Sequence, residues 1–193
     1  MVAPELEFFL VEKNIDPDFP LKPPIGRSGR PETARQAYGI DAVNEFDPLF
    51  EDIYDYCEAQ ELDIDTLIHE SGAAHMEINF LHGDPLDLAD QAFLFKRTCG
   101  EAAYRHGIYA TFMATPLKDE PGSAMHIYQS VVDKVTGVNI FATPDGKQTD
   151  LSSGRITTLF DKDESRWRDR RCLASGPLPT DQWRVDSARQ TAR

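Results

Sequence analysis

The segment ELEFFLVE at residues 5–12 constrains the fold most, because acids and large apolar residues alternate along it. Glu5 and Glu7 are two positions apart, while Leu6 and Phe8 occupy the positions after each of them. Only an extended strand sends residues i and i+2 to one face and the residues between them to the other. We therefore predict a strand over 6–11 with two carboxylates on one face and apolar side chains on the opposite face.

Two later segments have features typical of helices. The apolar stripe over residues 48–60 begins with Pro48, a residue suited to a first helical turn. The second segment opens at Asp84-Pro85 and continues to about residue 106, where Gly107 is placed to end it. We expect one helix over each segment.

The remaining patterned segments predict short strands. Residues 14–38 contain five prolines and the sequence GRSGRP, which lacks the lysine-serine ending of a phosphate loop, so we interpret them as a long solvated loop. The expected strands are two around the small residues SGAA within 67–81, then 108–115, 124–131 and 137–143, the last followed by a turn at Pro144-Asp145-Gly146. Strands interleaved with two substantial helices indicate an α+β fold.

The charge excludes several classes of partner. The 193 residues have a formal net charge of −13, which repels phosphate backbones and anionic lipids and favours divalent cations. We therefore expect no nucleic-acid partner and no membrane partner. No run approaches the length of a membrane helix, and the start MVAPELEFFLVEK has no basic leader. These features predict a cytoplasmic protein.

The cysteines predict no disulfide framework and no zinc site. Cys57, Cys99 and Cys172 are odd in number and widely spaced, with no CxxC and no nearby histidine pair. We interpret all three as reduced thiols, mostly buried.

The composition changes near residue 150. The first 150 residues hold 27 acidic and 11 basic residues, whereas residues 151–193 hold 6 and 9 together with both tryptophans. We expect one domain over 1–150 and a divergent basic tail over 151–193. For the tail, disorder is favoured over an alternative in which it covers apolar surface.

Four carboxylates and one histidine fall on predicted strands or at their ends. Glu70 and Glu77 flank the SGAA turn, and alternation puts His126 on one strand face. Considered alone, a pair of glutamates such as Glu5 and Glu7 is more often a solvated strand face, an isolated glutamate is usually solvated, and a strand histidine is more often a structural residue than a ligand. Taken together with Glu5 and Glu7, an oxygen-rich set with one imidazole suits Mg²⁺ or Mn²⁺ rather than zinc.

Five blocks of the sequence carry a resemblance to a known family. The blocks are APELEFFLVE, LIHESGAAHMEINFLHGDPLDLADQ, FKRTCGEAAYRHGIYATFMATP, GSAMHIYQSVVD and TGVNIFATPDG. In order and at similar spacing, they resemble the catalytic domain of type I glutamine synthetases, most of all the γ-glutamylpolyamine (γ-glutamylputrescine) synthetase branch. The resemblance covers about residues 3–148, and it implies part of a mainly antiparallel sheet with flanking helices, from a family that forms ring homo-oligomers.

The resemblance implies two divalent ions, Mg²⁺ or Mn²⁺, and ATP as a substrate. Glu7, Glu70 and Glu77 match the ligands of the first ion, beside the acceptor carboxylate. Glu5 and His126 match two ligands of the second ion, at the ATP phosphates. In the family, ATP phosphorylates the γ-carboxylate of glutamate, and ammonia or an amine then attacks the γ-glutamyl phosphate, while both ions offset charge on the phosphate oxygens.

Three more positions match substrate contacts of the family. Gly122 falls where the family backbone meets glutamate, and Tyr128 and Ser130 fall where it meets ATP. Without the resemblance, a turn glycine and an ordinary strand serine would be the preferred interpretations. Tyr128 replaces the second histidine of the family pattern MHxH, and a neutral phenol does not supply the charge of an imidazolium. Ala114 and Thr115 stand where relatives often have a lysine.

Segments outside the resemblance leave two functions open. The family's preceding β-grasp domain and its later arginine-bearing region have no counterpart here, so we expect a truncated or frame-disrupted form of a longer gene, or a pseudoenzyme. The first function is an ATP-dependent ligase that joins glutamate to ammonia, a small amine or a polyamine. The alternative is a catalytically inactive remnant that binds divalent metal or associates with a full-length relative. The resemblance assigns no general acid or base, and it leaves open whether this chain joins a ring.

Overall fold

The structure is a computed structural model that describes residues 1–143 except 15, 17, 33 and 34, then residues 145 and 147 and the backbone of 183–185. The chain divides into two compact units. The larger unit comprises Pro4–Leu81 and Pro85–Met125, and the smaller comprises Met1–Ala3, His82–Asp84 and His126–Arg193.

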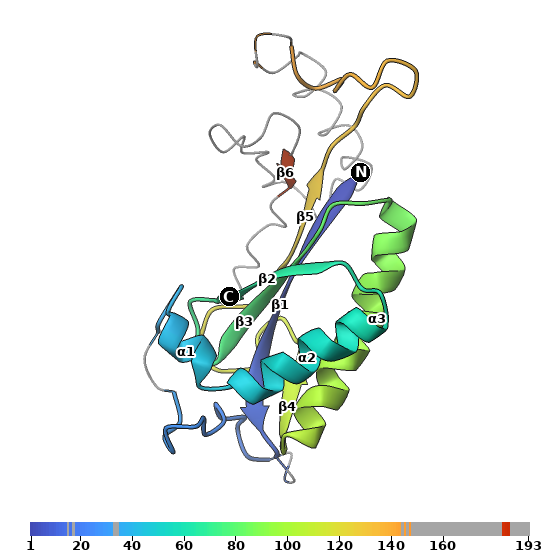
Figure 1. The fold of residues 1–193 in the computed structure, drawn as a ribbon. Coiled ribbons are helices and arrows are strands. Elements are labelled where there is room, and N and C mark those ends of the chain that lie inside the picture. The colour runs from blue at the N-terminus through green and yellow to red at the C-terminus, as the bar shows by residue number, and fades with distance from the viewer. Residues whose placement is uncertain are drawn as a thin grey trace. The chain divides into compact units, whose positions relative to one another are not determined.

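An antiparallel sheet forms the larger unit, with β1 running through its middle (Figure 1). β3 pairs with one side of β1 and β4 with the other, and β2 pairs with the free side of β3. The strands are β1 (Val2–Glu12), β2 (Ile64–His69), β3 (His75–Phe80) and β4 (Ile108–Thr111). The predicted strand at the start and the two predicted around SGAA are confirmed.

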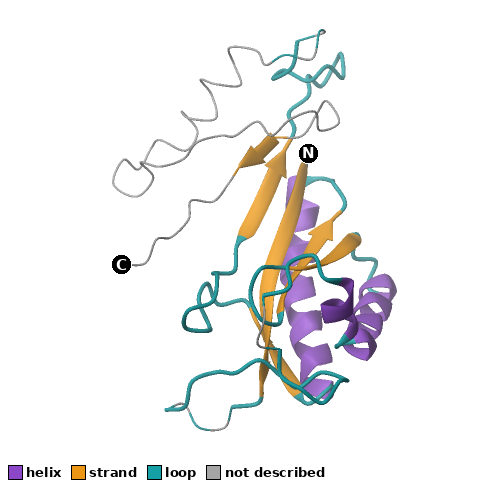
Figure 2. Ribbon diagram, turned by 90° about the vertical axis from the view of Figure 1, so that its left-hand side faces the viewer, coloured by secondary structure: helices purple, strands orange, loops and turns teal. Residues whose placement is uncertain are grey.

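Three helices accompany these strands: α1 (Ile40–Asn44), α2 (Asp47–Ala59) and α3 (Pro85–Arg105). Figure 2 shows the helices gathered on one side of the strands. Both predicted helices are confirmed, with Pro48 in the first turn of α2 and Gly107 at φ 79° just after α3. The short α1 was not predicted.

Aromatic side chains join the sheet to the helices. Phe95 of α3 is fully buried and packs edge to face against Phe8 of β1, Phe80 of β3 and Phe112, with ring centroids 6.2, 5.5 and 6.3 Å away. Leu6 is also buried and shares a face of β1 with Phe8. The predicted apolar face of β1 is therefore the sheet's contact with the helices.

The predicted strand over 108–115 is shorter than expected, since β4 ends at Thr111. Within 14–38, the described residues contain no helix or strand, as predicted. Cys57 and Cys99 are buried free thiols, and burial raises the pKa of Cys57 to about 11. Among the described residues, no helix is long and apolar enough to cross a membrane.

The smaller unit contains most of β5 (Met125–Gln129), which pairs antiparallel with β6 (Trp183–Val185). The strand predicted over 137–143 is wrong. The Asp133 carboxylate accepts bonds from the backbone N–H groups of Val135 and Thr136, and Gly137 follows at φ 70°. Side chain to backbone bonds of this kind compete with strand pairing.

Other predictions lie outside the described residues. These are the structure of the tail over 151–193, apart from the backbone of β6, the state of Cys172, and the positions of Pro144 and Gly146 in the predicted turn.

The packing of Phe95 yields a stability prediction. Truncating a fully buried phenylalanine removes its contacts and leaves a cavity, so Phe95→Ala should lower the free energy of unfolding by about 3–5 kcal/mol. Urea denaturation followed by circular dichroism measures this. Phe93→Ala is the matched control, because Phe93 lies on the same helix with 72% of its surface exposed. Equal losses in both variants would contradict the assignment of Phe95 to the core.

Candidate functional site

The register between β1 and β3 gathers carboxylates on the sheet face opposite the aromatic core. Glu7 lies directly across from Glu77, and Glu5 lies across from Asn79. Directly opposed residues in an antiparallel pair share a face. Only 7% of Glu7 and 5% of Glu77 are exposed, so these acids are not an ordinary solvated strand face.

Glu70 joins the same cluster from the connection between β2 and β3. Its backbone N–H donates to the carbonyl of His75, 2.7 Å away, which closes the turn. Its side-chain Oε2 accepts a bond from the N–H of Ser71 at 3.3 Å. The turn therefore fixes the backbone that carries this fourth carboxylate.

The electrostatics of Glu77 report how closely the carboxylates converge. Its pKa is raised to about 7, first by burial and then by the negative charges of Glu5, Glu70 and Glu7. A side-chain hydrogen bond from Asn79 at 3.2 Å opposes the increase without cancelling it. Carboxylates crowded in this way resist full ionisation unless a cation compensates them.

This donor set fits a hard divalent cation. Mg²⁺ and Mn²⁺ prefer carboxylate oxygens, and thiols are the ligands that would indicate a softer ion. The site offers four carboxylates, and the two described cysteines are buried free thiols whose pKa is raised by burial. The choice of Mg²⁺ or Mn²⁺ over zinc remains a prediction.

A second layer of contacts orients Glu7. Its Oε2 lies 3.2 Å from His75 Nε2 and accepts the backbone N–H of Ala124 at 2.9 Å. The Glu7 N–H in turn donates to the Ala124 carbonyl at 3.1 Å. His75 stacks on Phe9 with a centroid distance of 4.0 Å, and its Nε2 also lies 3.4 Å from the Ser123 hydroxyl. Glu7 is therefore held from two directions.

Gly122 begins the segment that reaches Glu7. A Cβ at this position would lie 2.8 Å from the backbone oxygen of Ala114, which real Cβ atoms essentially never do. The adjacent Ser123 N–H donates to that same oxygen at 2.9 Å. Close backbone approach thus explains why glycine is needed here, while its contact with a substrate stays a prediction.

The other predicted site residues belong to the smaller unit. His126 and Tyr128 are half-buried on β5, and Tyr128 pairs with Arg184 of β6. Ser130 follows β5, and its backbone N–H donates to the Met1 carbonyl at 2.9 Å. Their roles as metal and ATP contacts remain predictions.

Sequence reasoning missed His75, Ser123 and the contact between Glu32 and His69. His75 could have been found, because it precedes Glu77 by two positions and so shares its strand face. Glu32 could not, since it lies in a loop with no periodic pattern, 37 positions from His69.

Comparisons with known proteins agree with the resemblance in the sequence. The family described as glutamine synthetase, catalytic domain, matches residues 1–157. The γ-glutamylputrescine synthetase PuuA of Escherichia coli (strain K12) is 32% identical over 164 residues, which cover 83% of this chain and 34% of that protein. A glutamine synthetase of Pyrococcus horikoshii is 32% identical over 145 residues, covering 75% of this chain and 30% of that protein.

The fold has solved counterparts. The structure of GmaS without ligand aligns with a TM-score of 0.61 and 25% sequence identity, covering 77% of this chain and 33% of that one. The chain therefore spans about a third of the length of the relatives it matches. The α+β fold is that of part of a glutamine synthetase catalytic domain, as predicted.

The raised pKa of Glu77 makes stability depend on pH. A carboxyl whose pKa is about 7 when folded and 4.5 when unfolded keeps its proton longer in the folded state. The free energy of unfolding should therefore fall as pH rises from 4.5 to 7, by at most about 1.4 kcal/mol per pH unit from this group. Below that window and above it, Glu77 should contribute no slope.

Urea denaturation at pH 5, 6 and 7 in EDTA measures this effect in wild type and Glu77→Gln. The variant lacks the titrating group, so its stability should fall less steeply across the window. Parallel pH dependence in the two proteins would contradict the assigned shift.

Proposed function

The chain belongs to the glutamine synthetase catalytic-domain family, and from this premise we propose that it supplies the metal-binding sheet of an ATP-dependent ligase acting on glutamate. The convergence of Glu5, Glu7, Glu70 and Glu77 is the observation that carries the proposal. Four acids crowded on one partly buried surface have no evident structural use, because their mutual repulsion disfavours the ionised state.

The proposed reaction has two steps. A γ-carboxylate oxygen of glutamate attacks the terminal phosphorus of ATP, and ADP leaves. The nitrogen of ammonia or an amine then attacks the carbonyl carbon of the γ-glutamyl phosphate, inorganic phosphate leaves, and the nitrogen loses a proton. The product is an amide at the γ position of glutamate.

We assign the protein ligands as the family resemblance suggests. Glu7, Glu70 and Glu77 would hold one divalent ion, and Glu5 and His126 would contribute to a second. Bound Mg²⁺ or Mn²⁺ would supply positive charge to phosphate oxygens during transfer. His75 and the Ala124 N–H hold the Glu7 carboxylate in a fixed orientation, which leaves less side-chain freedom to be lost on binding.

The substrate assignments extend the same proposal. Gly122 would lie at the glutamate backbone, and Tyr128 and Ser130 would contact ATP. We favour a polyamine or another small amine over ammonia as acceptor, because the sequence is similar to a γ-glutamylputrescine synthetase. We also propose a cytoplasmic location.

Two functions were left open by the sequence, and we favour the ligase over the inactive remnant. The ligase is supported by the match to the family and by the similarity to a γ-glutamylputrescine synthetase and to glutamine synthetases.

The proposal is tested by calorimetric titration of the purified chain with Mn²⁺. Wild type should bind saturably, and Glu70→Ala with Glu77→Ala should lose that binding, because it lacks two of the four carboxylates. Phosphate release dependent on ATP, glutamate and an amine is then measured in the same samples. Putrescine and ammonia are compared as the amine.

Glu61→Ala with Glu101→Ala is the matched control, because both glutamates are exposed and lie outside the carboxylate cluster. This variant should bind Mn²⁺ as wild type does. Binding without turnover would instead support the inactive remnant, and the absence of saturable binding would refute the metal site.

A further inference from the structure

We propose that Glu32 is a positioning residue that holds the connection between β2 and β3, and with it the metal ligand Glu70, in place. This inference rests on the proposed function for the role of Glu70. Glu32 lies in the loop over residues 14–38, which the sequence predicted only to be solvated.

Glu32 reaches the turn through one carboxylate oxygen. Its Oε2 lies 3.0 Å from His69 Nε2 and accepts the backbone N–H of Ala74 at 2.8 Å. The side chain is 6% exposed and that of His69 is fully buried. One oxygen therefore joins the last residue of β2 to the residue just before β3.

The His69 ring connects Glu32 to the backbone of Glu70. Its other ring nitrogen, Nδ1, lies 2.7 Å from the Glu70 carbonyl oxygen. The His69 ring therefore lies within hydrogen-bonding distance of the Glu32 carboxylate at one nitrogen and of the Glu70 carbonyl at the other.

The turn needs support from outside. Ala74 has φ 52°, a left-handed conformation that residues with a Cβ adopt only at a cost. A second carboxylate, that of Glu120, accepts the N–H of the preceding Ala73 at 3.3 Å. Carboxylates from two distant segments therefore fix consecutive backbone groups of the turn that carries Glu70.

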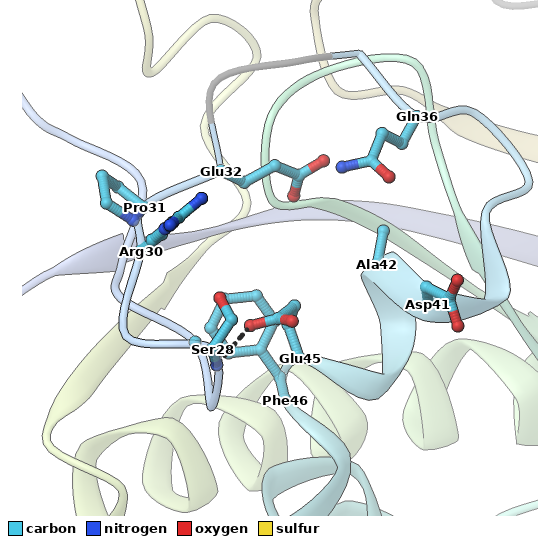
Figure 3. Close-up of a pocket in the computed structure, with 10 residues that line it drawn as sticks. Ser28, Arg30, Pro31, Glu32, Gln36, Asp41, Ala42, Glu45 and Phe46 are labelled. Carbon is cyan, nitrogen blue, oxygen red and sulfur yellow. Dashed lines mark hydrogen bonds between the residues drawn. The ribbon is translucent and has the colours of Figure 1, made fainter.

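The surroundings of Glu32 offer a matched control. Glu32 and Gln36 point toward each other beside a pocket that Glu45 also lines (Figure 3). Glu45 likewise accepts a backbone bond through one carboxylate oxygen, from Ser28 at 2.9 Å. That bond joins the loop to the end of α1 and does not reach the turn.

The experiment compares wild type, Glu32→Gln and Glu45→Gln as full chains. Mn²⁺ affinity is measured by calorimetry, and amide hydrogen exchange is measured at Glu70 and Ala74 by NMR in the absence of metal. Glu32→Gln should weaken Mn²⁺ binding about tenfold, as loss of a residue that supports a metal ligand commonly does, and should speed exchange at both amides. Glu45→Gln should change neither.

A double-mutant cycle separates positioning from general destabilisation. Because Glu32 acts through Glu70, adding Glu32→Gln to Glu70→Gln should weaken Mn²⁺ binding little further. Fully additive losses would overturn the proposal. If Glu32→Gln does not fold, Glu32→Asp takes its place, since it keeps the charge and withdraws the oxygen by one methylene.

The exchange measurement distinguishes failure of this inference from failure of the proposed function. Unchanged exchange at Glu70 and Ala74 in the Glu32 variant would overturn the positioning role, whatever the metal result. Faster exchange together with no Mn²⁺ binding by wild type would support the hold on the turn and refute the metal site itself.

Discussion

The pairing of Glu7 with Glu77 across β1 and β3 is the constraint on which the rest of the larger unit depends. It places two poorly exposed carboxylates face to face, an arrangement that repels itself without a cation. The register is fixed from the other side of the sheet, where Phe8 packs on Phe95. A slip of one residue would exchange the two faces of β1 and send the acids into the aromatic core.

Much of this arrangement could be predicted because it follows from local periodicity. Alternation in β1 separated Glu5 and Glu7 from Leu6 and Phe8, and the structure confirms both faces. An apolar stripe and a first-turn proline predicted α2, and the Asp84-Pro85 start with a terminal glycine predicted α3. The five-residue α1 was missed, since so short a segment carries too little periodicity to identify.

What the sequence could not provide was pairing between distant segments and competition from side chains. The contact of the Glu32 carboxylate with His69 joins a loop to a strand end, and no sequence pattern in either segment indicates it. The strand expected over 137–143 had a suitable composition, yet the Asp133 carboxylate draws the preceding backbone into a turn. Such bonds depend on geometry that composition does not encode. The assignments of His126, Tyr128 and Ser130 remain predictions.

The repulsion among the carboxylates links the stability of the sheet to the binding of a cation. Glu77 is disfavoured in its ionised form by burial and by three neighbouring acids, so the metal-free sheet is less stable at neutral pH than its core alone would allow. A cation that binds the folded chain recovers this free energy, because ligand binding to the native state adds to its stability. Rigid support of Glu7 by His75, and of the turn at Glu70 by Glu32, keeps the acids from relieving their repulsion by moving apart. The same repulsion that lowers the stability of the metal-free sheet would therefore favour the binding of a cation.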